Sequence, residues 1–475
     1  MMPLHNAESW PATFTLSRRL FALGLLASFS VSVLTFVRNP SVVLLAAIFF
    51  ASILSVLLYP IAGVYWIVAL TPFESLLNVE FNVLKLMKLA IIAIVGIRLY
   101  LEDRRAQLAY DPYRPVLQLM LAGALLATLL AASPLRSALG LTQFLIFCGY
   151  YFVVRRSRIS SGQAMRILQT LVLISFPVAA LAVLQSLFGY RGLLGSREQQ
   201  AMAQQDSFVT FWPSIQRASS SFGSSNAAGA FFTVAMLVAL IHALLIQEGR
   251  IRYLALAMSS GLGLAATFSR GALIGLLFSL LFLFIILRRA RLRWILTLSA
   301  AGLVVVGVAL APLPQVMGYL RVNDDLLSAS ISRVQAWEGA WIMVRQHPLS
   351  GIGFYEFKQG MLTAEGDPEA PLHPHNGVLK ALVEEGILGG AGYLYYFVVF
   401  VRTSVRTVRQ FAQRPALLWV FSSIAVTGVC FFSQELVDAG LTMGGSSLAI
   451  LFATLLAVQT SLRDSLETTL KLQPA

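Results

Sequence analysis

The sequence predicts an all-α, polytopic integral membrane protein, and two observations lead to this prediction. Hydrophobic residues make up 57% of the 475 residues, charged residues make up only 12%, and the mean hydropathy is +0.75. Apolar runs of about 20 residues recur along the chain, and this is the length that a helix needs to cross the hydrocarbon core of a bilayer. We therefore expect a bundle of helices that crosses the membrane many times.

The apolar runs define 14 candidate spans, of which the third is short and several are closely paired. In chain order they cover residues 20–36, 41–59, 61–75, 83–101, 114–132, 136–154, 165–188, 226–246, 251–268, 271–287, 294–311, 377–401, 416–435 and 443–460.

The basic residues predict the orientation of these spans. The chain has 35 Lys and Arg against 22 Asp and Glu, and the arginines gather in connectors such as 104–105, 155–158, 250–252, 288–293 and 402–414. The positive-inside rule places such connectors in the cytoplasm, so both chain ends are expected there too. The excess charge therefore indicates orientation, and no nucleic-acid partner is expected.

Two connectors on the opposite, periplasmic face are much longer than ordinary connections. They divide the chain into N-terminal transmembrane helices over 1–311 with a shorter periplasmic segment at 189–225, a long periplasmic loop at 312–376, and C-terminal transmembrane helices with a cytoplasmic tail at 377–475. Three of the five histidines lie in the long loop. Function is therefore expected at the periplasmic face.

Arginines occur on this face against the positive-inside bias, and an anionic ligand would explain them. They are Arg191, Arg217, Arg270, Arg333 and Arg345. Arg270 stands between Ser269 and Gly271 at a predicted helix start, where backbone N–H groups, the positive helix end and a guanidinium all favour a phosphate oxygen. The alternative is an arginine in a hairpin that extends its side chain to the membrane interface.

Three further basic residues allow both a binding and a structural role. Arg217 heads "RASSSFGSSNAAGAFF", a Ser/Gly-rich approach to a helix that Asn226 is expected to cap, and this suits a pyrophosphate or an ordinary solvated turn. Lys85 and Lys88 share one face of an outer helix end, where they could hold lipid head-group phosphates or reach the interface.

Metal chemistry has little support in the sequence. The chain contains no Asp-x-Asp, the two cysteines lie in apolar runs, and the carboxylates of "EGDPE" at 365–369 suit a solvated Pro/Gly loop better than a metal site. We therefore expect no metal and no cofactor.

The stretch "HPHNGVLKALVEEGILGG" combines polar residues with the start of a predicted span. Pro374 restricts the backbone before His375, and Asn376 can cap the helix that follows. A histidine at the positive end of a helix is kept neutral, the form that a general base requires, although a structural histidine is the alternative. Lys380 and Glu384 are spaced to pair with each other.

The same stretch resembles a motif of the bacterial O-antigen ligases, His-[Asn/Ser/Gln]-x9-Gly-x2-[Gly/Thr/Tyr], with His375, Asn376, Gly386 and Gly389 at the matching positions. The segment "RVQAWEGAWIMVRQHPLSGIGFYEF" resembles the loop signature of the wider ligase and polymerase superfamily. The stretches "RASSSFGSSNAAG" and "SRG" are similar to its two upstream arginine motifs. The resemblance covers roughly residues 180–390 by motif.

This resemblance implies a C-type glycosyltransferase-like helical bundle, usually of twelve spans, with a long periplasmic loop domain, in the bacterial inner membrane. The implied reaction is metal-independent, inverting transfer of a preassembled O-antigen glycan from undecaprenyl pyrophosphate to a sugar hydroxyl of lipid A–core. By the same resemblance, His375 is the base and Arg217 and Arg270 hold the donor pyrophosphate. Arg191, Asn376, Ser269, Arg333, Lys85 and Lys88 are the further candidates for binding substrate or membrane lipid.

Three alternatives share many of these features. An O-antigen polymerase has much of the same loop signature, and a protein-glycosylating relative would use a Ser or Thr acceptor. A transporter or lipid flippase would also be basic and polytopic, but transporters place polar groups on broken helices at the bilayer midplane. Here the polar motifs cluster at one predicted surface.

Overall fold

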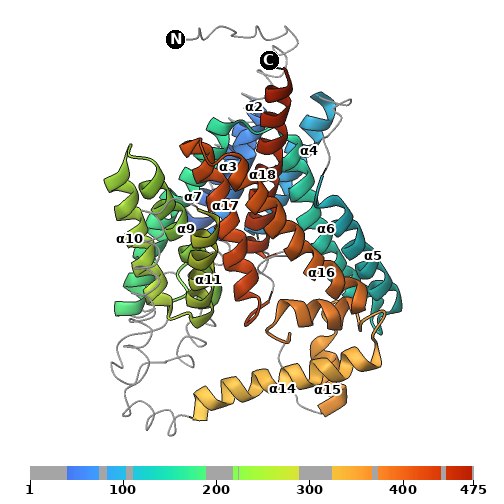
Figure 1. Ribbon diagram of the computed structural model, residues 1–475. Coiled ribbons are helices and arrows are strands. Elements are labelled where there is room, and N and C mark those ends of the chain that lie inside the picture. Colours follow the sequence, from blue (N-terminus) through green and yellow to red (C-terminus); the bar gives the residue numbers. More distant parts are fainter. Residues whose placement is uncertain are drawn as a thin grey trace.

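The computed structural model describes residues 40–73, 83–102, 111–188, 218–222, 224–287, 324–365, 373–439 and 446–472. All regular elements within these ranges are helices, as expected, and none of these residues forms a β-strand (Figure 1). The predicted spans 20–36 and 294–311 lie outside the described residues.

The described helices largely follow the apolar runs, with two more inside the predicted long loop at 312–376. They are α2 (Pro40–Leu58), α3 (Pro60–Leu70), the short 3-10 helix η2 (Thr71–Phe73), α4 (Val83–Glu102), α5 (Arg114–Leu130), α6 (Pro134–Arg156), α7 (Ser161–Phe188), α9 (Ser225–Leu245), α10 (Arg250–Thr267), α11 (Arg270–Ile286), α14 (Asp324–Gln346), α15 (Phe357–Glu365), α16 (Gly377–Gln410), α17 (Pro415–Gln434) and α18 (Ser447–Leu472). Proline stands in the first turn of α3, α5, α6 and α17, where its missing N–H costs no hydrogen bond.

Four of the described helices are long and apolar enough to cross a membrane, judged by length and composition. They are Pro134–Arg156, Ser161–Phe188, Ser225–Leu245 and Pro415–Gln434. These helices make the chain consistent with a membrane protein, whereas the number of 12 to 14 spans stays a prediction.

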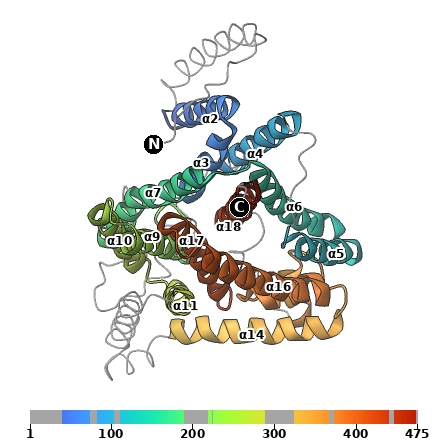
Figure 2. The ribbon, with the colours of Figure 1, turned by 45° about the horizontal axis from the view of Figure 1, so that its top comes forward.

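The C-terminal helices occupy the inside of the bundle. In Figure 2, α18 lies in the middle, between α6, α7 and α17. The side chains of α17 are buried along nearly its whole length, and the described side chains of α18 are buried up to Leu462. The hydrophobic core therefore gathers around the two last helices in the described part of the chain.

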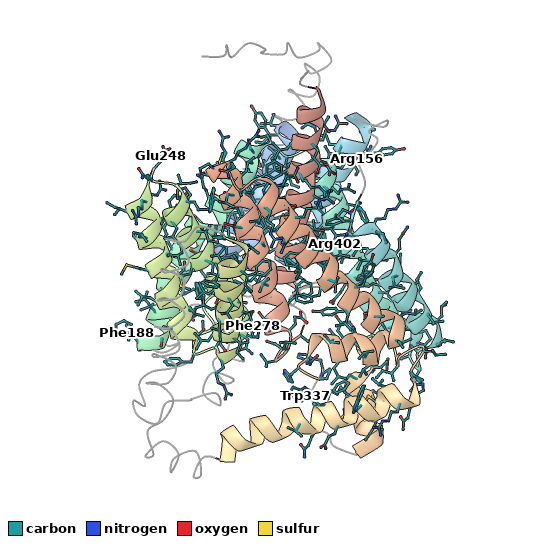
Figure 3. The ribbon with its side chains drawn as sticks, in the orientation of Figure 1. Arg156, Phe188, Glu248, Phe278, Trp337 and Arg402 are labelled. Atoms are coloured by element: carbon teal, nitrogen blue, oxygen red, sulfur yellow. The ribbon has the colours of Figure 1, made fainter. Side chains whose placement is uncertain are left out.

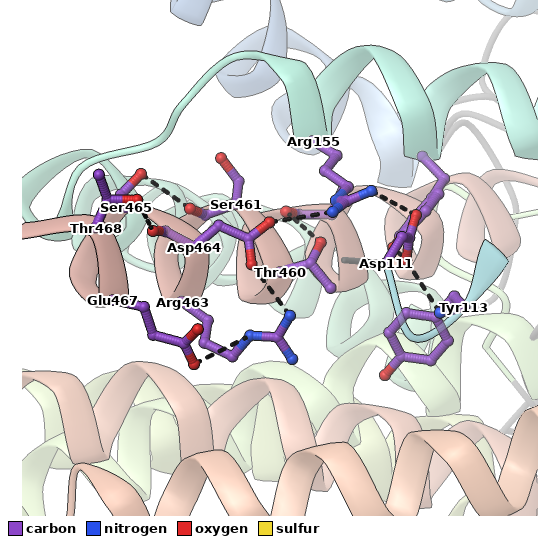
Figure 4. Close-up of polar contacts among 12 residues, drawn as sticks. Asp111, Tyr113, Arg155, Thr460, Ser461, Arg463, Asp464, Ser465, Glu467 and Thr468 are labelled. Atoms are coloured by element: carbon purple, nitrogen blue, oxygen red, sulfur yellow. Dashed lines mark hydrogen bonds and ion pairs between the residues drawn. The ribbon is translucent and has the colours of Figure 1, made fainter. Parts of the chain in front are cut away.

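A buried ionic network fastens α18 to the helices before it (Figure 4). Arg155, at the end of α6, lies 2.6 Å from a carboxylate oxygen of Asp111 and 3.1 Å from one of Asp464 on α18. The hydroxyl of Tyr151 donates to the other oxygen of Asp111 at 2.8 Å. Because its partners surround Arg155, removing any one of them leaves a buried charge under-compensated, which costs about 3–5 kcal/mol in buried pairs.

The two ends of the bundle differ in the connectors that they carry. Figure 3 places Arg156 and Glu248 at one end and Trp337 of α14 at the other. Arg156 and Glu248 belong to connectors that are expected in the cytoplasm, whereas Trp337 belongs to the predicted periplasmic loop. Which end faces the periplasm stays a prediction.

A small apolar cluster, separate from the main core, binds the loop helices to α16. Ala336, Ala340 and Met343 of α14 pack with Phe357 and Met361 of α15 and with Val383 of α16. This cluster holds the first part of α16 in place, and that part carries the histidine motif.

Candidate active site

The helix that begins after His375 is broken at Gly386. The sequence predicted a span over 377–401, and Gly386 within it has non-helical backbone angles, φ 67° and ψ −161°. This glycine divides α16 into a short first segment, 377–385, and the long helix that follows. His375 therefore lies at the N-terminus of the short segment.

Backbone hydrogen bonds tie the loop 347–354 to this break. The N–H of Ile352 donates to the carbonyl of Val383 at 2.8 Å, and the N–H of Gly353 donates to that of Glu384 at 3.0 Å. In the other direction, the N–H of Ile387 donates to the carbonyl of Pro348 at 2.9 Å. The loop thus pairs backbone groups that the break removes from the helix.

Two glycines make this close approach possible. Gly386 and Gly351 both have positive φ, 67° and 65°. A β-carbon at Gly386 would collide with the carbonyl oxygen of Leu349, and one at Gly351 would collide with the carbonyl group of Glu384. The "HPLSGIGF" loop and the histidine motif, which are separate stretches of sequence, therefore form one structural unit.

The residues before the short segment are held from two sides. Asn376 caps it as expected, accepting from the N–H of Leu379 at 2.9 Å, and its amide donates to the carbonyl of Leu436 at 3.2 Å. The indole N–H of Trp337 donates to the carbonyl of Pro374 at 2.7 Å. His375 itself has a positive φ of 49°, a conformation that costs a non-glycine residue energy and is common at functional sites.

His375 lies in a cluster with His373 and Asp438, and their potential ligand atoms are within 4.8 Å of one another. Nδ1 of His373 accepts a hydrogen bond from the N–H of His375 at 3.2 Å. Burial lowers the pKa of His373 from 6.5 to about 3, and the charges of His375 and Lys380 act in the same direction. His373 is therefore neutral, and the donor set of the cluster could also hold a metal ion.

A polar pocket begins next to this cluster, between the short segment, α5, α6 and the turn after α17. Its charged walls are Lys380, Glu384, Glu385 and Glu435. Lys380 and Glu384 both line this pocket, and their i, i+4 spacing on the short segment favours the expected pairing. Glu385 is buried, and its Oε2 has no hydrogen-bond partner among the described residues.

The two upstream arginine motifs meet at the starts of α9 and α11. Ser269 caps α11, accepting from the N–H of Ala272 at 3.3 Å, so the predicted helix start is confirmed, and the side chain of Arg270 is exposed there. The hydroxyl of Ser269 donates to Oδ1 of Asn226 at 3.0 Å. We expected Asn226 to cap α9, but Ser224 is the cap.

The serines that approach α9 are used for packing. Ser219, Ser220 and Ser221 are buried, and the hydroxyl of Ser220 donates to the carbonyl of Val178 at 2.6 Å. Nε2 of Gln185 donates to the carbonyl of Ser220 at 3.1 Å. These contacts fit the structural alternative for the serines and bind the approach to α7.

The remaining predicted residues have different outcomes. Arg191 and Arg217 lie outside the described residues, and the side chains of Arg333 on α14 and Lys85 on α4 are likewise not described. Lys88 is fully buried, and its Nζ donates to Ser447 Oγ at 3.0 Å, where we had expected an exposed outer helix end. Lys88 thus joins α4 to the start of α18.

The turn after α17 connects the arginine motif to the histidine motif, and the sequence reasoning missed it. A β-carbon at Gly271 would lie 3.3 Å from Val437 and 3.4 Å from Gln434. On the other side, the N–H of Gly377 donates to the carbonyl of Glu435 at 2.7 Å, and Asp438 joins the histidines. The sequence offered one signal for this turn, the polar run "SQELVD" that ends an apolar stretch at the predicted periplasmic face.

Comparison with known proteins agrees with the motifs. Residues 253–394 match a family model described as O-antigen ligase, and this range contains Arg270, His375 and the break at Gly386. No curated protein matches the chain. The match supports the assignment of this chain to the O-antigen ligase family.

Proposed function

We propose that the protein is an O-antigen ligase, which transfers a preassembled glycan from undecaprenyl pyrophosphate to a sugar hydroxyl of lipid A–core. The observation that carries the proposal is the turn 434–438, because the start of α11 packs on one side of it and the histidine cluster lies on the other. The backbone next to the proposed phosphate-binding arginine and the proposed base for the acceptor thus adjoin the same short turn.

In the proposed reaction, the acceptor hydroxyl oxygen attacks the anomeric carbon of the glycan as its proton passes to His375. The bond between that carbon and the pyrophosphate oxygen breaks, and its electron pair leaves with undecaprenyl pyrophosphate. Attack from the side opposite the leaving group inverts the anomeric configuration. Residues of the family pattern thereby divide into an acceptor side and a donor side.

On the donor side, Arg270 and Arg217 hold the pyrophosphate, with Arg191 as a helper. A planar guanidinium can bind two phosphate oxygens at once, and donors that are already in position stabilise the charge that develops on the leaving group. This replaces a metal ion in the proposed mechanism, so transfer by the purified protein is expected to survive EDTA. Loss of transfer that Mg²⁺ or Mn²⁺ restores would contradict this point.

We place the reaction at the periplasmic face of the inner membrane. Reporter enzymes fused near residue 340 should read periplasmic, and those fused near residue 290 should read cytoplasmic, because arginine-rich connectors mark the cytoplasm. The reverse pattern would exclude a periplasmic site.

The decisive test is the lipopolysaccharide of a deletion strain. A ligase deletion should give rough lipopolysaccharide and accumulate full-length lipid-linked glycan, and the wild-type gene should restore the smooth form. Lipopolysaccharide that carries a single repeat unit would identify a polymerase instead. Normal lipopolysaccharide with a protein that has lost its glycan would identify a protein O-oligosaccharyltransferase.

A further inference from the structure

The histidine cluster has the composition of a metal site as well as that of a catalytic site. His373 and His375 precede α16, Asp438 follows α17, and each offers one ligand atom within 4.8 Å of the others. Two imidazoles and a carboxylate with a fourth position left open are a donor set of zinc sites that keep an exchangeable ligand. We propose that these three residues bind a divalent cation of the zinc class, and that the bound cation inhibits glycan transfer.

The geometry requires only a small closure of the cluster. In a tetrahedral zinc site with bonds of about 2.0–2.2 Å, the ligand atoms lie about 3.4 Å apart. The two imidazole rings already have their centroids 4.4 Å apart, and all three side chains are only partly buried. Rotations of these side chains can therefore bring the ligand atoms together, and a cation can reach them from solvent.

The hydrogen bonds of His373 and Asp438 can be replaced or shared when a cation binds. Nδ1 of His373 accepts the N–H of His375 at 3.2 Å, which is at the long end of the range for such bonds, so replacing it costs little. The N–H of Ala439 donates to Oδ1 of Asp438 at 2.9 Å, and a carboxylate has further lone pairs for a cation. Imidazole ligands select zinc-like ions over Mg²⁺ and Ca²⁺, which prefer oxygen.

The inhibitory effect rests on the proposed function of His375. A histidine that coordinates a cation has given up the lone pair that would otherwise accept the proton of the acceptor hydroxyl. The cation is therefore not a cofactor of this reaction, and adding it should stop a transfer that proceeds without it.

Binding can be tested without any substrate. The purified full-length chain in detergent is titrated with ZnCl2 in a calorimeter, and with CoCl2 while visible absorption is recorded. We expect one equivalent to bind, and His373→Ala and Asp438→Asn should each weaken binding by about tenfold or more, since each removes one of three ligands. His347→Ala is the matched control, because His347 is an exposed histidine of the same loop outside the cluster.

The site is overturned if zinc does not bind, if neither cluster variant weakens binding, or if His347→Ala weakens it equally. For inhibition, ZnCl2 is titrated into a transfer assay with wild-type protein and Asp438→Asn. We expect zinc to stop transfer, EDTA to restore it, and the inhibitory concentration to rise in the variant by the same factor as the dissociation constant. Zinc that binds at the cluster without slowing transfer overturns the inhibition.

The two proposals fail separately. Transfer that is absent from untreated wild-type protein would contradict the ligase function, while the calorimetric result would still decide the metal site. Normal transfer together with absent zinc binding would overturn the metal site and leave the ligase function standing.

Discussion

Replacing Gly386 by alanine should detach the loop 347–354 from the broken helix. The backbone angles at Gly386, φ 67° and ψ −161°, lie in a region that only glycine occupies readily, and holding alanine there costs about 1–3 kcal/mol. The new β-carbon would also collide with the carbonyl oxygen of Leu349. The loop must therefore move away from α16.

The size of the effect follows from the contacts that are lost. Three backbone hydrogen bonds join the loop to the break, and each contributes about 1 kcal/mol net, so together they supply about 3 kcal/mol. Because 1.4 kcal/mol corresponds to a factor of ten, amide hydrogen exchange in this region should accelerate by roughly 100-fold. Transfer should fall as well, since the moved loop no longer supports the segment that follows His375.

The assay is hydrogen exchange by mass spectrometry on the purified chain in detergent, following peptides that cover residues 348–356 and 383–390. Gly149→Ala is the matched control, because Gly149 lies inside α6 and a β-carbon there would have no neighbouring atom within 4 Å. This control should leave exchange in the loop unchanged. If exchange in Gly386→Ala stays within about threefold of wild type, the substitution has not broken the three backbone hydrogen bonds, and the reasoning is refuted.

Two further predictions concern single side chains. His375→Ala should slow transfer by about 10²–10⁴-fold at unchanged protein level, and lipid-linked donor should accumulate. The control His347→Ala should transfer normally. Near wild-type transfer by His375→Ala would exclude a base role for His375. Arg270→Lys should transfer poorly, because lysine loses the bidentate contact with phosphate. The control Arg250→Lys, at the opposite end of the bundle, should transfer normally. Equal activity of the two variants would favour an interfacial role for Arg270.

His373 is an unsuitable internal control for His375, because its ring accepts the N–H of His375 and so contributes to the backbone position of that residue. His347 is exposed and outside the cluster, which makes it the better control.

Local sequence signals predicted the helices and two of their caps. Apolar runs marked the helices of the described residues to within a few positions in most cases, because burial in a bilayer depends on composition and length alone. Asn376 and Ser269 were identified as residues at helix starts, since their side chains cap the backbone a few residues away. Signals of this kind need no knowledge of the rest of the fold.

Contacts between distant segments explain what the sequence did not predict. Asn226 is a good capping residue, but its side-chain oxygen accepts a hydrogen bond from Ser269, 43 residues away. Ser224 caps the helix instead. The buried Lys88 donates a hydrogen bond to Ser447, 359 residues away. The conformation of Gly386 is imposed by a loop that docks from another segment, so nothing within the motif itself predicts the break.

The position of α18 restricts the order in which the bundle can be completed. Asp464 on this helix and Arg155 on α6 are 309 residues apart, and every other described helix leaves the ribosome before α18 does. Until α18 has packed, Asp111 is the carboxylate that balances Arg155. Packing of α18 therefore fills the middle of the bundle and supplies the second carboxylate, Asp464, to this buried arginine in one step.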